Sequence, residues 1–260
     1  MQGNSIVADG AEELSKNTIW TNLQKLNLSE NGLGDKGAAA LSKNLAWTNL
    51  RNLNLTYNTI GAQGAAELSR NTTWKNLRAL NLSGNLLGED GSRELGKNTS
   101  WINLEILNLL GNQINDDGAI ELGKNKTWSY LKTLRLGNNS IGLKGVTEFS
   151  KNETWNNLQT LTLGGNLIND EAVEELSKNT TWSNLQILSL CGSQFSDKGA
   201  TELRKNTTWI NLRKLDISRN KISNEAVEEL RQNTSWSKRL RVLFTNSFAH
   251  IDIFSLRNLS

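Results

Sequence analysis

Hydrophobic and polar positions along this chain repeat with a constant period. The clearest marker is tryptophan, which stands at positions 20, 47, 74, 101, 128, 155, 182, 209 and 236, always 27 residues apart. Three residues after a tryptophan the pattern Leu-x-x-Leu-x-Leu-x-x-Asn-x-Leu/Ile begins, as at Leu23, Leu26, Leu28, Asn31 and Leu33. The alternation through its centre predicts a short, half-buried strand. A fixed period between about 20 and 50 residues predicts a solenoid of stacked units.

The second half of each unit has the spacing of a short helix. Ala38 and Leu41 are three residues apart, as residues on one helical face are, and the spacing recurs in later units. The glycine before them leaves room for close packing. We expect the polar residues at the helix start to serve as N-caps: Asp35, Asp116, Asp170, Asp197 and Asn224.

The strand and helix patterns together resemble the leucine-rich repeat. The repeat length and the GAxELxKN helix are similar to the ribonuclease-inhibitor-like class, which also occurs in NLR-type immune receptors and related bacterial proteins. This resemblance implies an α/β fold: a right-handed leucine-rich-repeat solenoid shaped as a horseshoe or arc. Strands stack about 4.8 Å apart and helices about 8–10 Å apart, so a parallel sheet lines the concave face and short helices the convex face.

The same register divides the chain, residues 1–260, within one solenoid domain. Residues 1–19 form a partial first repeat, residues 20–235 eight full repeats, and residues 236–260 an irregular C-terminal cap. The missing first strand indicates either a piece of a longer array or an end that packs on another chain, including self-association through this uncapped end. The apolar C-terminal residues either cover the last repeat or dock another subunit: Phe244, Phe248, Ile251, Ile253, Phe254, Leu256 and Leu259.

Two asparagine columns and the tryptophan column recur in register. One asparagine follows each strand and should bond backbone groups there, with Ser193 interrupting the column. A second column runs from Asn22 to Asn211 and is broken at Tyr130. Indole rings can stack on ligands, but nine copies in register favour a ladder at the edge of the core. Most of the twelve Asn-x-Ser/Thr sequons also share repeat positions, so copying of the repeat explains them better than glycosylation does.

Composition excludes several classes of function. The net charge of +3 comes from interspersed acids and bases, without a basic run for nucleic acid. No stretch approaches the roughly 20 apolar residues of a membrane span, and residues 1–5 do not begin a signal peptide. Cys191 is the only cysteine, which suits a cytoplasmic protein, although a secreted chain after signal removal would start in the same way.

Catalytic residues are not evident. The chain has one histidine, His250, and one cysteine, so no His/Cys cluster has metal-ligand spacing. No phosphate-binding loop or dinucleotide motif occurs. We therefore expect no enzymatic activity, no metal and no cofactor.

A binding surface for another protein is the remaining candidate. Residues between the buried leucines should face outward, and the asparagine run there breaks at Arg135, beside Ile106 and Leu110. An arginine beside aliphatic anchors is typical of protein interfaces. The alternative is that sequence drift between repeats, without any function, left a few apolar residues on this polar face. The alternative function is a sensor or structural array within a larger receptor or effector. Nucleic acid is not expected, since the outward cations are scattered. The candidate partner-binding residues are Tyr57, Ile106, Leu110, Arg135, Ile187 and Arg219.

Overall fold

Strand and helix alternate regularly in a computed structural model that describes residues 1–236 and 238–245. The helices of this part are α1 Val7–Ser15, α2 Gly34–Ser42, α3 Ala62–Arg70, α4 Gly88–Gly96, α5 Asp116–Lys124, α6 Leu143–Ser150, α7 Asp170–Ser177, α8 Asp197–Arg204 and α9 Asn224–Arg231. The strands are β1 Lys25–Asn27, β2 Asn52–Asn54, β3 Ala79–Asn81, β4 Ile106–Asn108, β5 Thr133–Arg135, β6 Thr160–Thr162, β7 Ile187–Ser189, β8 Lys214–Asp216 and β9 Arg241–Leu243.

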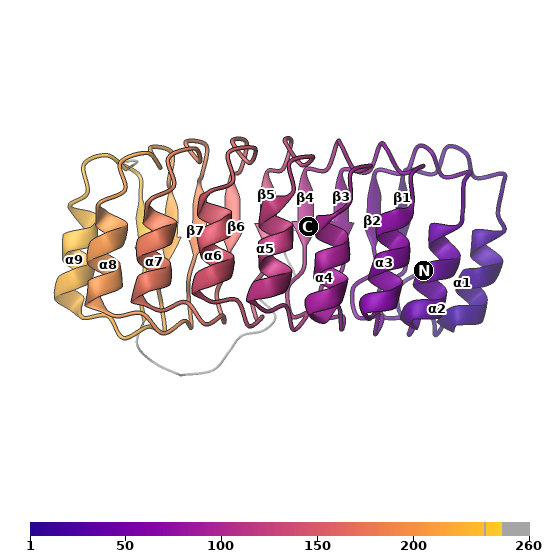
Figure 1. Ribbon diagram of the computed structural model, residues 1–260, viewed down its shortest axis with the longest axis horizontal. Coiled ribbons are helices and arrows are strands. Elements are labelled where there is room, and N and C mark those ends of the chain that lie inside the picture. The colour runs from indigo at the N-terminus through magenta and orange to yellow at the C-terminus, as the bar shows by residue number, and fades with distance from the viewer. Residues whose placement is uncertain (237, 246–260) are drawn as a thin grey trace.

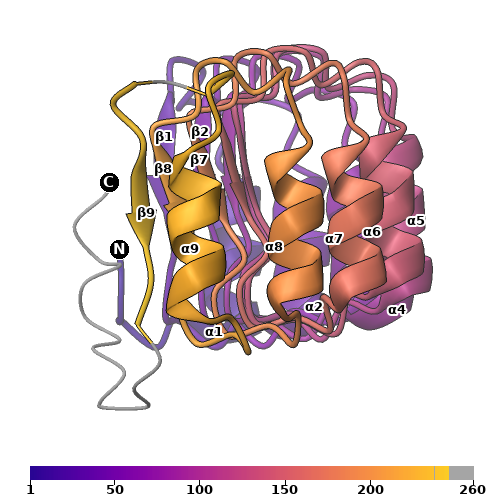
Figure 2. The same cartoon turned by 90° about the vertical axis from the view of Figure 1, so that its left-hand side faces the viewer.

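All strands belong to one parallel sheet whose order is the order of the chain. Each residue pairs with the residue 27 positions later, as Leu26 with Leu53 and Leu53 with Leu80. The helices form a single row on one side of the sheet (Figure 1). Viewed along the row, they bow outward around the middle of the chain, and within the described residues the other face of the sheet is uncovered (Figure 2). The predicted arc of repeats, with helices on the convex side, is confirmed.

The core is a continuous strip between sheet and helices. The strand leucines and the helix positions equivalent to Ala38 and Leu41 are buried from α2 to α9, whereas Leu14, Leu23, Leu240 and Val242 at the two ends are half-buried. The seven tryptophans from Trp47 to Trp209 are 0% exposed and Trp236 is nearly so, whereas Trp20 at the open end is 36% exposed. Trp209 and Trp236 stack with ring centroids 6.5 Å apart. The tryptophan column therefore belongs to the core, and it offers no row of ligand-stacking sites.

The asparagine ladder connects neighbouring repeats through the backbone. The Nδ2 group of Asn139 donates to the Leu109 carbonyl at 3.1 Å, and its Oδ1 accepts from Asn112 N and Ile114 N at 2.9 and 3.0 Å. Ser193 breaks this ladder, and its buried hydroxyl has no hydrogen-bond partner among the described residues. The column from Asn22 to Asn211 forms a second ladder of amide-to-carbonyl bonds, in which the Nδ2 groups of these residues donate to the preceding repeat: Asn49, Asn76, Asn103, Asn157, Asn184 and Asn211.

The acidic residues at the helix starts cap the following repeat, so their assignment as caps of their own helices is wrong. Asp35 is the second residue of α2, and its Oδ1 accepts from Gly61 N and Gly64 N at 2.6 and 2.9 Å, at the start of α3. Asp170 likewise accepts from Ser196 N and Gly199 N at 2.7 and 2.9 Å. A Cβ added at Gly64 would lie 2.7 Å from the Asp35 carboxylate. The small residue at this position therefore permits the bond between adjacent helices.

The two ends of the array differ from its middle. At the start, α1 precedes β1, and β1 is an edge strand of the described sheet, with β2 as its neighbour. Met1, Ile19, Trp20 and Leu23 line an open groove of about 540 Å³ beside β1. At the other end, β9 adds a strand that the irregular-cap prediction did not include. The half-buried side chains of Leu240, Val242 and Phe244 pack there on the core. The remaining tail residues lie outside the described residues: Phe248, His250, Ile251, Ile253, Phe254, Leu256 and Leu259.

Candidate interaction surface

The centre of the uncovered sheet face combines aliphatic side chains with one arginine. Arg135 pairs in register with Asn108, so Ile106 and Leu110 lie on the neighbouring chain segment, two residues to either side of that partner. Ile106 is 42% exposed, and Arg135 and Leu110 are half-buried. A Cβ added at Gly137 would lie 2.9 Å from Leu110 Cδ1, so the leucine side chain lies against this glycine. The structure therefore brings these three predicted residues together in one patch, which we name the central patch.

The other three predicted residues lie outside the central patch. Ile187 is on β7, three strands from Ile106, or about 14 Å at the usual strand spacing. Tyr57 follows β2 and is 56% exposed, and Arg219 follows β8 and is half-buried. The six residues thus follow the arc as an extended track, and together they do not form a single site.

Tyr57 and Arg219 occupy a backbone position that favours glycine. Their φ angles are +52° and +58°, and Gly84, Gly111 and Gly165 have positive φ at the equivalent position. A bulky L-residue in this left-handed region costs about 1–2 kcal/mol. The Tyr57 ring also lies across the next repeat, because a Cβ on Gly84 would lie 2.2 Å from its Cε1 atom. Glu30 and Asn138 also have positive φ at this position, so the conformation belongs to the repeat, and Tyr57 and Arg219 are the aromatic and cationic side chains that it carries.

An ion-pair triad, which is not among the predicted site residues, borders the central patch. Glu105 precedes β4 and accepts from Arg78 at 3.3 Å and from Lys132 at 2.7 Å, each one repeat away. All three side chains are at least a quarter exposed, so the pairs contribute little to stability. Their effect is to hold three long side chains in one row beside Ile106. The signal in the sequence is one acid between two bases, each separated by 27 residues.

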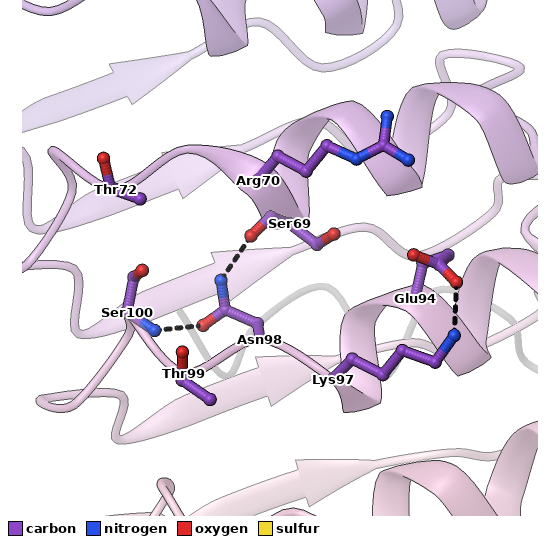
Figure 3. A pocket seen from close by; sticks show the side chains of 8 residues that line it. All are labelled: Ser69, Arg70, Thr72, Glu94, Lys97, Asn98, Thr99 and Ser100. Carbon is purple, nitrogen blue, oxygen red and sulfur yellow. Dashed lines mark hydrogen bonds and ion pairs between the residues drawn. The ribbon is translucent and has the colours of Figure 1, made fainter.

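The convex side has polar contacts that serve the packing of repeats. A crevice of about 240 Å³ lies between the ends of α3 and α4 (Figure 3), below the roughly 300 Å³ of the smallest usual ligand sites. Several of its polar groups are engaged: Asn98 donates to the Ser69 carbonyl and accepts from Ser100 N, and Lys97 pairs with Glu94. We assign no ligand to it.

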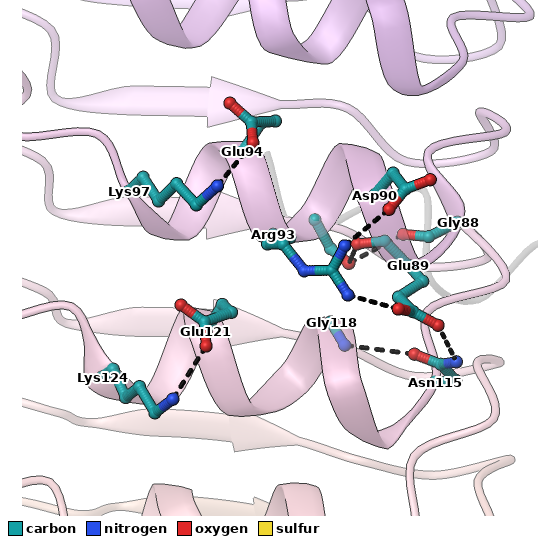
Figure 4. Close-up of polar contacts among 11 residues, drawn as sticks. Gly88, Glu89, Asp90, Arg93, Glu94, Lys97, Asn115, Gly118, Glu121 and Lys124 are labelled. Carbon is teal, nitrogen blue, oxygen red and sulfur yellow. Dashed lines mark hydrogen bonds and ion pairs between the residues drawn. The ribbon is translucent and has the colours of Figure 1, made fainter.

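A polar cluster on the convex side joins α4 to α5. Arg93 contacts Glu89 and Asp90, and Asn115 Nδ2 donates to Glu89 at 2.8 Å while its Oδ1 caps Gly118 N (Figure 4). The bond from Asn115, together with Arg93, lowers the pKa of Glu89 below its ordinary value. The cluster fixes the contact between two neighbouring helices and contains no unused nucleophile. In residues 1–236 and 238–245 no group of three or more His, Cys, Asp or Glu side chains could hold a metal ion.

The sequon asparagines before the tryptophans are structural. Asn152 is buried, donates through Nδ2 to the Gly123 and Asn125 carbonyls, and accepts from Trp155 N. A glycan on this Nδ2 would disrupt the contact between repeats. The same arrangement recurs at further buried positions of the column: Asn71, Asn98, Asn125, Asn179 and Asn206.

The class of protein is defined by stacked strand–helix units of equal length that are joined by hydrogen bonds from asparagine side chains. The leucine-rich-repeat family model matches residues 21–42, 48–69, 102–123, 129–150 and 210–230. The chain is a leucine-rich-repeat protein. Assignment to the ribonuclease-inhibitor-like class stays a prediction. A comparison with curated proteins finds no match.

Solved structures share the fold at low identity. An internalin, InlF of Listeria monocytogenes, is 21% identical, with 90% of this chain and 71% of that chain covered and a TM-score of 0.51. A chain from the yeast Rad7–Elc1 complex is 17% identical, with 91% and 66% covered and a TM-score of 0.50. A chain from the Arabidopsis receptor kinase HAESA, solved with the peptide hormone IDA and the co-receptor SERK1, is 20% identical with a TM-score of 0.48. The match covers 77% of this chain and spans 30% of that one.

The family to which the chain belongs consists generally of interaction scaffolds, and the repeats support a protein-interaction array. No helix of the described part is both long and apolar enough to cross a membrane.

Proposed function

We propose that this protein binds another protein on its uncovered sheet face, without catalysis, metal or cofactor, and that the central patch is the principal contact. The observation that carries the proposal is the register of β4 and β5, which puts Arg135 between Ile106 and Leu110. Interfaces concentrate their binding energy in a few aliphatic, aromatic and arginine side chains surrounded by polar ones. Tyr57 and Arg219, held in strained backbone conformations, extend the surface toward both ends.

The proposal is tested by capture from an extract of the source cells. Wild-type protein fixed on beads is compared with the double variant Leu110→Ser/Arg135→Gln, and retained proteins are identified by mass spectrometry. The matched control is Leu45→Ser/Lys36→Gln, because Leu45 and Lys36 are exposed on or beside α2, away from the sheet face.

The central-patch variant should lose the partner and the control should keep it. Both should unfold within about 1 kcal/mol of wild type, since the altered side chains are exposed or half-buried. A partner captured equally by all three proteins contradicts the central patch as the contact.

A second candidate function is an array that sets spacing or senses a signal within a larger receptor or effector. Its support is the open groove at the N-terminal end, where Ile19 is 80% exposed and Trp20 36%. Self-association through this end is a related proposal. We also propose that the protein acts in the cytoplasm, because a single cysteine suits a reducing compartment. Sedimentation at increasing concentration tests self-association: Ile19→Ser/Trp20→Ser should abolish it, and a wild-type protein that stays monomeric contradicts it.

A further inference from the structure

Four cationic residues lie on or next to β8 and β9, at the C-terminal end of the array. Arg213 immediately precedes β8, Lys214 begins β8 and Arg241 begins β9, whereas Arg219 lies beyond the other end of β8. Lys214 and Arg241 are direct register partners, so their side chains leave the same face of adjacent strands, about 4.8 Å apart. We name these four residues the cationic corner. Three of the four are exposed and Arg219 is half-buried.

None of these four residues takes part in an ion pair within the described residues. The nearest acid in the sequence, Asp216, accepts from the backbone and hydroxyl groups of Ser218. The contrast is Glu105 further along the sheet, which stands between two bases and pairs with both. Like charges directly opposite one another in a sheet are destabilising. The fold therefore gives no reason for the corner.

On the helices the acidic residues outnumber the basic ones, and several of these acids form ion pairs there. Next to the cationic corner, α9 carries Glu225, Glu228 and Glu229, of which Glu228 pairs with Arg231 and Glu229 with Arg204. The basic residues of β8 and β9 therefore lie on the opposite side of the array from the acidic residues of α9. Such an arrangement attracts an anionic partner to the sheet face and repels it from the helices.

An aliphatic side chain lies beside the corner. Ile187 on β7 is the register partner of Lys214 and is half-buried. The described strands β7, β8 and β9 contain no aromatic residue on which a base could stack, and Phe244 after β9 packs on the core. Cations beside an aliphatic contact, without stacking rings, fit a protein segment better than a nucleic acid.

We infer that the cationic corner binds an acidic segment of the partner protein, with carboxylates against Lys214 and Arg241 and an aliphatic side chain against Ile187. This inference rests on the proposed binding of a protein to the sheet face, and it specifies the chemistry of that partner. The central patch supplies the apolar contact and the corner supplies charge selection.

The test uses a fluorescein-labelled peptide of glutamates with a central leucine, followed by fluorescence anisotropy. Wild type is compared with Lys214→Gln/Arg241→Gln and with the control Lys36→Gln/Lys144→Gln, which removes two exposed cations from α2 and α6. The corner variant should bind roughly tenfold more weakly and the control within about twofold, since exposed charge pairs are individually modest. Binding should also weaken as salt rises from about 0.1 M to about 1 M. The corner variant should unfold no more easily than wild type.

Three results overturn the inference: equal peptide binding by all variants, tighter binding of a single-stranded oligonucleotide that the corner variant loses, or concentration-dependent self-association that the corner variant loses. Capture from the extract separates it from the proposed function. If Leu110→Ser/Arg135→Gln loses the partner and Lys214→Gln/Arg241→Gln retains it in full, the inference about the corner alone fails. If neither variant affects capture, binding to the sheet face fails as well.

Discussion

Replacing a central tryptophan tests the assignment of the tryptophan column to the core. Trp128 is 0% exposed, and a buried tryptophan removes about 200 Å² from water, worth about 5 kcal/mol at about 25 cal/mol per Å². That value is an upper bound because the unfolded chain already buries part of this area. Trp128→Ala leaves a cavity between two repeats, so we expect a loss of about 3–5 kcal/mol in the free energy of unfolding.

Trp20 provides the internal control in the same column. It is 36% exposed at the open end, where water can fill the space of the lost ring, so Trp20→Ala should cost about 1–2 kcal/mol. Urea unfolding followed by far-UV circular dichroism measures both losses. Hydrogen exchange localises them, because each repeat contacts mainly its neighbours. If Trp128→Ala does not fold, Trp128→Phe should show a smaller loss. A central loss no larger than that of Trp20→Ala would refute the assignment to the core.

Three further changes test the contacts between repeats and the sheet surface. Ser193→Asn restores the ladder and should stabilise the protein by about 1 kcal/mol in urea unfolding, because Nδ2 gains carbonyl acceptors and Oδ1 gains the amide of Asn166; a lower midpoint would count against it. Burial raises the pKa of Asp170, but hydrogen bonds from the next repeat outweigh it and the pKa lies below its ordinary value. Its stabilisation is therefore present above the unfolded-state pKa and is lost as the pH falls through the folded-state pKa. Asp170→Asn should cost about 1–2 kcal/mol near pH 7 and progressively less as the pH falls through the folded-state pKa of Asp170; a cost that stays constant over this acid range in urea titrations would contradict this. Tyr57→Gly should relieve the backbone strain at the positive φ and leave the thermal midpoint within a few degrees of wild type while weakening partner capture. Full capture of the partner by this variant would exclude Tyr57 from the partner-binding surface.

Most of the fold could be predicted from the sequence because each repeat encodes the same local pattern. The leucines at 23, 26 and 28, repeated every 27 residues, determine which face of every strand is buried. Asn139 and its equivalents follow strands that end at one edge of the sheet, so a ladder follows from the register. The central patch was predictable for the same reason, since Arg135 lies one repeat after Asn108.

The tertiary structure alone decided which groups pair across repeats. Asp35 has the sequence position of a residue that caps its own helix, yet its carboxylate bonds Gly61 and Gly64, because the stacked helix lies within hydrogen-bond reach. Strand β9 carries an atypical sequence and forms by pairing with β8, which brings Arg241 beside Lys214. Periodicity determines which residues share a column, whereas side-chain reach and the spacing of stacked elements determine which of them meet. The sequence by itself therefore established the array and its core, and the packing of one repeat on the next established its caps and its charged corner.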